Sequence, residues 1–467
     1  MTQNYAQNYA SEVWEKDRAH FMHPWTHFDS FKEKGSLVID SSQGAYVSDI
    51  EGKSYLDGIG GLWCVNVGYG RQEIAEAMAE QATRMAFYNP FGDTTNVPAS
   101  ELAAKLAELA PGSLNHVFYS CGGSTANDTA FRLITFYHRC RGKPEKRHFI
   151  ARREAYHGST YAAMSLGAKK MDRVEWFEFI TDNIHHISEP NTYRRPDGMS
   201  ESDFKDALLK EFEDKILEIG ADNVAAFFAE PIMGAGGVLV PPDGYMTGMR
   251  ALCDKYDVLF VADEVVTGFG RVGHMFASKD MFGIEPDIIT CAKGLTSGYQ
   301  PLGATIFSDE IWDTISAPNP DRYFPHGFTY SGHPVACAAA LKNIEIIERE
   351  DICGHVREVG AYFRDKLDNL RDLDIVGDVR GSHFMACVEF VGNKQTKELF
   401  ESHVDISKRV SSEAEELGLI VRPVAHLNVL SPPLIVTKAQ CDEMIDILRR
   451  SIVAATDKLK SEGLLIA

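Results

Sequence analysis

Two ionisable residues, Asp263 and Lys293, each stand at the end of a short apolar run and are the first candidates for chemistry in this chain. Asp263 ends the run VLFVA, and Lys293 ends the run DIITCA. Apolar runs of this length, bounded by turn residues, are typical of strands buried on both faces, as in a parallel sheet. Because ligands of open α/β sheets bind outside the carboxyl ends of the strands, the sequence predicts an acid and an amine at a ligand site.

Pyridoxal phosphate (PLP) is a cofactor that needs such a pair of groups. Proteins hold PLP as a Schiff base on a lysine, and a carboxylate keeps its ring nitrogen protonated. In this interpretation Lys293 forms the Schiff base, and Asp263 pairs with the ring nitrogen so that the ring draws electrons from the substrate carbon. By spacing alone, the same two residues also fit a surface lysine at a strand end and a helix-capping aspartate.

Longer motifs around both residues resemble those of the class III (omega) aminotransferases, which are PLP enzymes of fold type I. ADEVVTGFGRVG resembles the family's segment around the pyridine-binding aspartate, and AKGLTSGYQPLGA resembles its segment around the Schiff-base lysine. The resemblance extends from about Ser36 to the C-terminus. It implies an α/β fold of the aspartate-aminotransferase-like type, with a large domain built on a mostly parallel central sheet and a smaller α/β domain.

The expected organisation of the chain has three parts. Length divided by about 150 residues per domain gives roughly three units. Residues 1–65 are expected to form an N-terminal segment that joins the small domain and the substrate entrance. Residues 66–330 are expected to form the large PLP-binding domain, and residues 331–467 the C-terminal small domain.

Local patterns predict several elements along the chain. Alternation over residues 36–57, with Asp-Ile-Glu-Gly-Lys in its middle, predicts a hairpin. Periodicity predicts helices over residues 71–86, 98–110 and 202–219, the second closed by Pro-Gly. Residues 165–205, which contain scattered prolines and glycines, are expected to form an irregular excursion near the mouth of the site.

A glycine-rich turn is the candidate phosphate site. HVFYSCGGSTANDTAF predicts a strand, a turn and then a helix, and a helix N-terminus offers free N–H groups and a positive dipole end to a phosphate. Gly123 and Ser124 are expected to hold the phosphate of PLP. The segment GSTAND resembles the family's phosphate motif, with Thr125 in place of the usual glutamate.

Other residues are assigned to the cofactor by the resemblance. Tyr156 is expected to stack on the pyridine ring, since an aromatic face fixes the ring plane; a buried core tyrosine is the alternative. His157 and Val265 are expected beside it. Glu230 ends the apolar strand AAFFAE, and a buried carboxylate is costly unless it is paired. The matching glutamate of the family lies close to the cofactor and can pair with a mobile arginine.

Two segments point to a homodimer, or a dimer of dimers, with sites shared between subunits. The segment around Thr329 resembles the one whose threonine reaches the phosphate of the partner subunit's PLP. The loop FYNPFGDTTN resembles the loop that crosses the dimer interface, where Phe91 shapes the partner's pocket. Each site is then completed by two chains. Gly92 stands where many relatives carry a second phenylalanine.

The substrate pocket is expected to be aromatic, with one arginine for carboxylates. Arg422 resembles the family's flexible arginine, which binds the carboxylate of a keto acid and swings out when an amine without a carboxylate is bound. The planar guanidinium pairs bidentately with carboxylates. A surface arginine after a strand is the alternative, and the following Val-Ala-His differs from the family's usual turn. The substrate-facing aromatic residues are expected to be Trp25, Trp63, Phe91 and Tyr156.

The expected activity is a ping-pong transamination that moves an amino group from an omega-amino acid or primary amine to pyruvate, giving alanine. Lys293, once freed, is expected to carry the proton between the donor carbon and the cofactor. Three alternatives stay open: 2-oxoglutarate as the acceptor, as in 4-aminobutyrate-type enzymes, an aminomutase, and a non-catalytic PLP-binding protein. The sequence does not discriminate among amine donors.

Composition excludes several other classes of protein. The net charge of −20 opposes nucleic acid and anionic membranes as partners. No apolar run approaches the roughly 18 residues of a membrane span, and the polar, acidic start resembles no signal peptide, so a cytoplasmic location is expected. Nine scattered cysteines without a C-x-x-C pair favour reduced thiols. Pro24 interrupts the spacing of three N-terminal histidines, and no metal site is expected.

Overall fold

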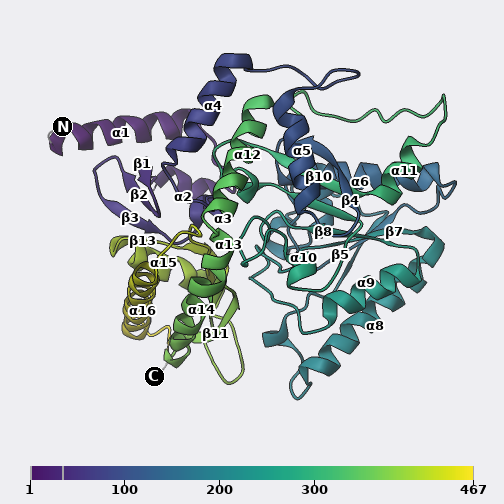
Figure 1. The fold of residues 1–467 in the computed structure, drawn as a ribbon. Coiled ribbons are helices and arrows are strands. Elements are labelled where there is room, and N and C mark those ends of the chain that lie inside the picture. Colours follow the sequence, from purple (N-terminus) through teal and green to yellow (C-terminus); the bar gives the residue numbers. More distant parts are fainter. Residues whose placement is uncertain (1–2, 34–35, 466–467) are drawn as a thin grey trace.

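The structure, a computed structural model, describes residues 3–33 and 36–465. The described chain forms three sheets with helices packed around them (Figure 1). In chain order the helices are α1 (Gln3–His20), α2 (Phe28–Glu33), α3 (Gly60–Trp63), α4 (Gln72–Met85), α5 (Val97–Leu109), α6 (Gly123–Cys140), α7 (Tyr161–Leu166), α8 (Glu201–Ile219), α9 (Tyr245–Lys255), α10 (Ala277–Asp280), α11 (Asp309–Ser316), α12 (Pro334–Arg349), α13 (Ile352–His355), α14 (Ala361–Leu367), α15 (Ile406–Glu416) and α16 (Lys438–Ser461).

The largest sheet has seven strands in the order β4-β10-β9-β8-β7-β5-β6. Strand β10 pairs antiparallel with both of its neighbours, and every other pair in the sheet is parallel. The prediction of a mostly parallel central sheet is therefore confirmed. The strands are β4 (Leu114–Ser120), β5 (His148–Arg152), β6 (Ile184–Ile187), β7 (Val224–Ala229), β8 (Leu259–Asp263), β9 (Ile288–Cys291) and β10 (Gly303–Ser308).

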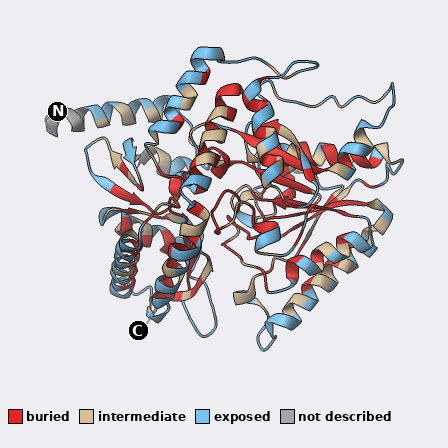
Figure 2. Cartoon of the chain, in the orientation of Figure 1, coloured by how far each residue is buried: buried red, intermediate tan, exposed pale blue. Residues whose placement is uncertain are grey.

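Strands β8 and β9 bring the two candidate catalytic residues together. Both strands are buried along their whole length, as their unbroken apolar sequences predict. They pair in parallel with Asp263 opposite Thr290, so their carboxyl ends lie side by side. Lys293 follows two residues after β9 ends, at the start of a short 3₁₀ turn, Lys293–Leu295. Figure 2 shows the buried residues concentrated in this sheet and the exposed ones on the outer faces of the helices.

The N-terminal strands pair with the C-terminal part of the chain. A four-stranded sheet has the order β1-β2-β3-β13, and β13 lies parallel to β3. In Figure 1 these strands lie beside α15 and α16. The predicted division into three domains stays a prediction, but the pairing joins residues more than 360 positions apart, with Leu419 opposite Leu56. The strands are β1 (Ile39–Gln43), β2 (Tyr46–Asp49), β3 (Ser54–Asp57) and β13 (Leu419–Ile420).

The third sheet is antiparallel throughout, with the order β11-β12-β15-β14. It carries Arg422 at the first position of its edge strand β14, where sequence analysis placed it after a strand. Helix α15 packs on both β14 and β15. The strands are β11 (Val376–Ser382), β12 (Met385–Phe390), β14 (Arg422–Val424) and β15 (Leu427–Leu430).

Most local predictions are confirmed, and one is wrong in part. The hairpin is β2–β3, and the helices over 71–86, 98–110 and 202–219 are α4, α5 and α8. The stretch 165–205 is not wholly irregular, because it contains β6, the edge strand of the large sheet. Two histidines interrupt the apolar signal of its sequence, Ile-His-His-Ile. His186 is accommodated because its ring nitrogen donates to the carbonyl of Leu166 at 3.0 Å.

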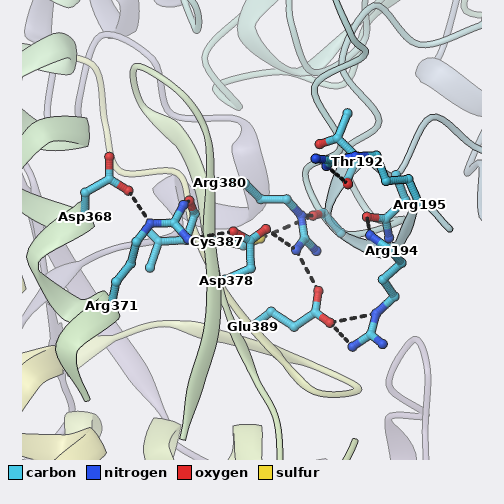
Figure 3. Close-up of polar contacts among 12 residues, drawn as sticks. Thr192, Arg194, Arg195, Asp368, Arg371, Asp378, Arg380, Cys387 and Glu389 are labelled. Atoms are coloured by element: carbon cyan, nitrogen blue, oxygen red, sulfur yellow. Dashed lines mark hydrogen bonds and ion pairs between the residues drawn. The ribbon is translucent and has the colours of Figure 1, made fainter. Parts of the chain in front are cut away.

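An ion network joins the segment before α8 to the third sheet (Figure 3). Glu389 on β12, with only 5% of its side chain exposed, accepts from Arg194 Nε at 2.9 Å and from Arg380 Nη1 at 2.6 Å. Arg380 also donates to Asp378 at 3.0 Å and to the carbonyl of Gly237 at 2.7 Å. Since Gly237 lies in the loop after β7, the network ties the third sheet to the loops of the large one.

Removing Glu389 is expected to destabilise this junction. Breaking a buried ion pair by deleting one partner costs about 3–5 kcal/mol. For Glu389→Ala we expect about 2 kcal/mol, because Arg194 is partly exposed to solvent and Arg380 keeps Asp378. Thermal unfolding measures the effect as a lowered melting temperature. Glu398→Ala, at an exposed position whose carboxylate makes no hydrogen bond or ion pair in the described structure, is the control, and equal melting temperatures for the two variants would contradict the prediction.

Candidate active site

A cavity of about 220 Å³ opens at the carboxyl ends of β8 and β9 and contains most of the predicted site residues. Its floor is formed by buried residues such as Asp263 and Glu230, and its mouth by Trp25, whose side chain is 64% exposed. The predicted residues that line it are Trp25, Trp63, Gly123, Ser124, Tyr156, His157, Glu230, Asp263, Val265, Lys293 and Arg422.

Asp263 is held in place by three hydrogen bonds. Its Oδ2 accepts from Asn127 Nδ2 and from His157 Nδ1, both at 2.8 Å, and its Oδ1 accepts from the amide of Val265 at 3.1 Å. The site therefore presents a carboxyl group in a fixed orientation, which is what pairing with a ring nitrogen requires.

Asn127 is a site residue that sequence analysis missed. It lies one turn into α6, where its Oδ1 accepts from Thr290 at 2.8 Å and its Nδ2 also donates to the carbonyl of His157 at 2.7 Å. Asn127 thus connects three elements around Asp263. A signal was present, because a buried asparagine inside a helix needs partners for both ends of its amide.

Glu264, the neighbour of Asp263, was also missed. This fully buried carboxylate accepts from the backbone amides of Ala277 and Ser278 at 2.9 and 2.8 Å, and from Thr267 Oγ1 at 2.7 Å. It therefore fastens the loop after β8 back onto the start of α10. The loop carries Val265 to the cavity wall.

Lys293 has the environment of a reactive amine. Burial lowers the pKa of its ammonium from the ordinary lysine value. Within the described residues its Nζ makes no hydrogen bond. Its backbone has a φ of +46°, a strained region for a residue with a side chain, and such strain clusters at functional sites. An amine that lines the cavity without a hydrogen bond in the described residues fits covalent attachment of an aldehyde cofactor.

The N-terminus of α6 forms an anion cradle. Its N-cap, Gly122, makes no side-chain cap, so the first turn offers its free N–H groups beside the cavity. A Cβ on Gly123 would lie 2.9 Å from a methyl group of Val265, and a Cβ on Gly158 would lie 2.6 Å from the Cα of Ser124. These close approaches require glycine at both positions beside the free N–H groups. The residues present therefore fit PLP: the N-terminus of α6 would hold its phosphate, and Asp263 and Lys293 would hold its ring.

Tyr156 and Glu230 meet on the wall of the cavity. The Glu230 carboxylate accepts from the amides of Tyr156 at 3.2 Å and Gly234 at 2.7 Å, and burial raises its pKa. No hydrogen bond joins Glu230 to Arg422 in the described structure. The Tyr156 ring packs edge-on against Trp25, with centroids 5.9 Å apart. Tyr156 thus lies between the floor and the mouth.

The mouth carries three charged groups. Arg422 and Lys169 provide two cations and Asp172 one carboxylate, and all three line the cavity. Asp172 Oδ1 accepts from Trp25 Nε1 at 3.4 Å and lies 3.9 Å from Lys169 Nζ. Lys169 and Asp172 were not singled out by sequence analysis, because they belong to the stretch expected to be irregular.

Phe91 and Thr329 do not line the cavity of their own chain. Both are exposed, Phe91 with 53% of its surface accessible. They lie on neighbouring loops, since the Phe91 ring would come within 3.5 Å of a Cβ on Gly327. Their assignment to the site of a second subunit stays a prediction.

Comparison with known proteins identifies the family. The family model described as aminotransferase class III matches residues 30–452. The chain belongs to the class III aminotransferases. It is 42% identical to putrescine–pyruvate aminotransferase of Pseudomonas aeruginosa over 95% of this chain and 97% of that protein. It is 39% identical to diaminobutyrate–2-oxoglutarate transaminase of Halomonas elongata, over 96% of this chain and 97% of that protein.

Solved structures agree in fold and cofactor. The omega transaminase from Pseudomonas jessenii, solved in complex with PMP, superimposes with a TM-score of 0.93 at 36% identity, over 96% of this chain and 99% of that chain. The predicted α/β fold of type I is confirmed, and the protein is an aminotransferase that uses PLP. In the described residues no helix is long and apolar enough to cross a membrane, and no cluster of three His, Cys, Asp or Glu side chains is arranged for a metal.

Proposed function

We propose that this protein transfers the amino group of a primary amine or omega-amino acid to pyruvate, giving alanine, in two half-reactions. PLP, when bound, supplies an electron-withdrawing ring that stores the amino group between the two halves. The proposal concerns the substrates and the roles of single residues. Its main support is the charge at the cavity mouth, where two cations and one carboxylate leave a net charge of +1.

Each group that lines the cavity has a separate role in this proposal. Lys293 holds the cofactor covalently and, when displaced by the donor amine, moves the proton to and from the donor carbon. Its lowered pKa suits this work, because a general base must lose its proton near the operating pH. Asp263 keeps the ring nitrogen protonated. Tyr156 covers one ring face, while Gly123 and Ser124 hold the phosphate.

The choice of pyruvate as the acceptor is based on the charges of Arg422 and Asp172. Arg422 lines the mouth and makes no hydrogen bond within the described part of the chain, so its guanidinium is available to a carboxylate. Asp172 lines the same mouth and repels a second carboxylate. One net positive charge suits pyruvate, which carries one carboxylate, better than 2-oxoglutarate, which carries two. The similarity to a putrescine–pyruvate aminotransferase supports the same acceptor.

A second copy of the chain is proposed to complete the site. Phe91 and Thr329 lie on exposed loops, and the exposed aromatic side chains beside them include Phe87 and Tyr330, whose rings are 5.7 Å apart. Large exposed aromatic side chains in one place mark a protein interface. Light scattering of the purified protein should give the mass of a dimer or a larger even assembly; a single-chain mass would contradict this part of the proposal.

Product analysis with two acceptors tests the function. With 1-phenylethylamine or 4-aminobutyrate as the donor, we expect alanine from pyruvate to form with a kcat/KM at least about tenfold above that of glutamate from 2-oxoglutarate. Arg422→Leu should raise the KM for pyruvate about 10- to 100-fold, the loss of one charge-assisted bidentate contact. Arg450→Leu, at an exposed arginine on α16, is the matched control.

The other outcomes identify the alternatives. Faster formation of glutamate would make 2-oxoglutarate the acceptor. An isomerised amine that forms without any keto acid would indicate an aminomutase. A protein that binds PLP and converts none of the amines tested would be a binding protein, and the proposed function would fail.

A further inference from the structure

Lys169 is a partly buried lysine that makes an ion pair but no hydrogen bond in the described structure. Only 12% of its side chain is exposed, and its Nζ lies 3.9 Å from Asp172 Oδ1, within ion-pair distance but beyond hydrogen bond distance. The N–H donors of its ammonium group therefore lie on the wall of the substrate cavity without a hydrogen bond acceptor in the described residues. Removing a charge from water is costly unless the charge is both paired and hydrogen-bonded, so the position favours a ligand that accepts hydrogen bonds from Lys169.

Lys146 is a buried lysine with a structural role and serves as a comparison for Lys169. Lys146 is more deeply buried than Lys169, and its ammonium donates to four backbone carbonyl oxygens at 2.7 to 3.3 Å. The chain thus provides hydrogen bond acceptors for the ammonium of Lys146, whereas Lys169 lines the cavity with an ion pair but no hydrogen bond. The difference distinguishes a lysine that stabilises the fold from a lysine whose ammonium group can bind an anion.

The groups that line the mouth around Lys169 favour an anion over a cation. Arg422 lines the same mouth, also without a hydrogen bond in the described residues, and its charge acts on Lys169. Asp172 neutralises one of the two cations. Glu154, which also acts on Lys169, does not line the cavity and accepts the amide of Lys170 at 3.4 Å. Among the three charged groups that line the mouth, one positive charge remains, which matches one carboxylate.

We propose that Lys169, together with Arg422, binds the distal carboxylate of the amine donor, so that omega-amino acids are the preferred donors. The orientation of the donor follows from the residues at the two ends of the cavity. The donor amine reacts at Lys293 on the floor, and Lys169 lies at the mouth beside Trp25, so a donor that spans the cavity places its far end against Lys169. This inference rests on the proposed transamination and adds to it the class of donor.

The test compares three donors of equal carbon number that differ in the charge of the far end. These are 5-aminopentanoate, pentylamine and 1,5-diaminopentane. Lys169→Met should raise the KM for 5-aminopentanoate about tenfold or more, while its kcat changes less than about twofold. The KM for pentylamine should stay unchanged, and the KM for 1,5-diaminopentane should stay unchanged or fall. Lys169→Arg, which keeps the charge, should retain most of the affinity for 5-aminopentanoate.

Two controls separate recognition from folding and from turnover. Lys170→Met removes the neighbouring exposed lysine and should leave all three donors unaffected. Calorimetry of pentanoate, a carboxylate without an amine, should show binding about tenfold weaker in Lys169→Met holoenzyme than in the parent. Because pentanoate does not react, this measurement decides the role of Lys169 even if no donor is converted and the proposed function fails.

Several results would overturn the inference. Equal changes in KM for all three donors would make Lys169 a structural residue, and unchanged values for 5-aminopentanoate and pentanoate would remove it from the site. A parent enzyme that prefers 1,5-diaminopentane, and loses that preference in Asp172→Asn, would show that the mouth binds an ammonium group through Asp172 instead.

Discussion

Lys293→Ala is expected to lower kcat by about 10³-fold or more with every donor, because the variant lacks both the covalent attachment point and the proton carrier. The backbone should tolerate the change, since alanine has the same Cβ as lysine and meets the φ of +46° with the same strain. Turnover of amine and pyruvate measures the loss. Lys279→Ala, at an exposed lysine on α10, is the control and should keep the parent's activity.

Chemical trapping gives an independent readout for Lys293. Borohydride treatment of the parent holoenzyme, followed by peptide mass spectrometry, should place the reduced cofactor on the peptide that contains Lys293. The same treatment of the variant should leave every peptide unlabelled. Normal turnover in the variant, or labelling at another lysine of the parent, would disprove the assignment.

Asp263→Asn is expected to have the second largest effect, a loss of about 10²-fold in kcat. The substitution keeps the size of the side chain but removes the negative charge that is held by Asn127 and His157. Loss of one preorganised electrostatic contact in a site typically costs 10²–10³-fold in rate, roughly 3–4 kcal/mol. The new amide nitrogen would also face the donor groups of Asn127 and His157, so the ring would lose its counter-charge and its positioning together.

Kinetics, the absorption spectrum and thermal unfolding of the same variant distinguish a defect in the active site from a defect in folding. Rates with pyruvate, and the absorption spectrum of the bound cofactor, should both change, while the melting temperature of the protein with PLP stays within a few degrees. Asp280→Asn, at an exposed aspartate in α10, should change neither rate nor spectrum. A kcat within about twofold of the parent in Asp263→Asn would remove Asp263 from the reaction.

The elements that carry Asp263 and Lys293 could be predicted because their signals are local. An unbroken apolar run that ends in one charged residue specifies both a buried strand and the residue at its carboxyl end, as in β8. The same holds for the cradle at α6, where a glycine turn precedes a long helix. Strand β6 was not predicted because its two histidines interrupt the apolar pattern of a buried strand. One of them, His186, is stabilised in the strand by a hydrogen bond to the carbonyl of Leu166, a contact that exists only in the folded chain.

The charged groups at the cavity mouth could not be predicted from local patterns. Nothing near Lys169 in the sequence distinguishes it from Lys170, yet Lys169 is partly buried and lines the cavity, while Lys170 is exposed. Asn127 and Thr290, separated by 163 positions, become partners only because β9 passes beside α6. Whether a polar group is satisfied depends on which distant backbone reaches it.

By itself, therefore, the sequence determined the class of protein and the cofactor, and it predicted the pair of residues that the cofactor needs, since each depends on short motifs with their own backbone geometry. The tertiary structure alone decided which charges meet at the mouth of the cavity. Arg422 arrives there on a strand of the third sheet, and Lys169 and Asp172 arrive on the segment that follows α7. Charges so far apart in the chain interact only after folding has brought them to the wall of one cavity and excluded much of the water between them.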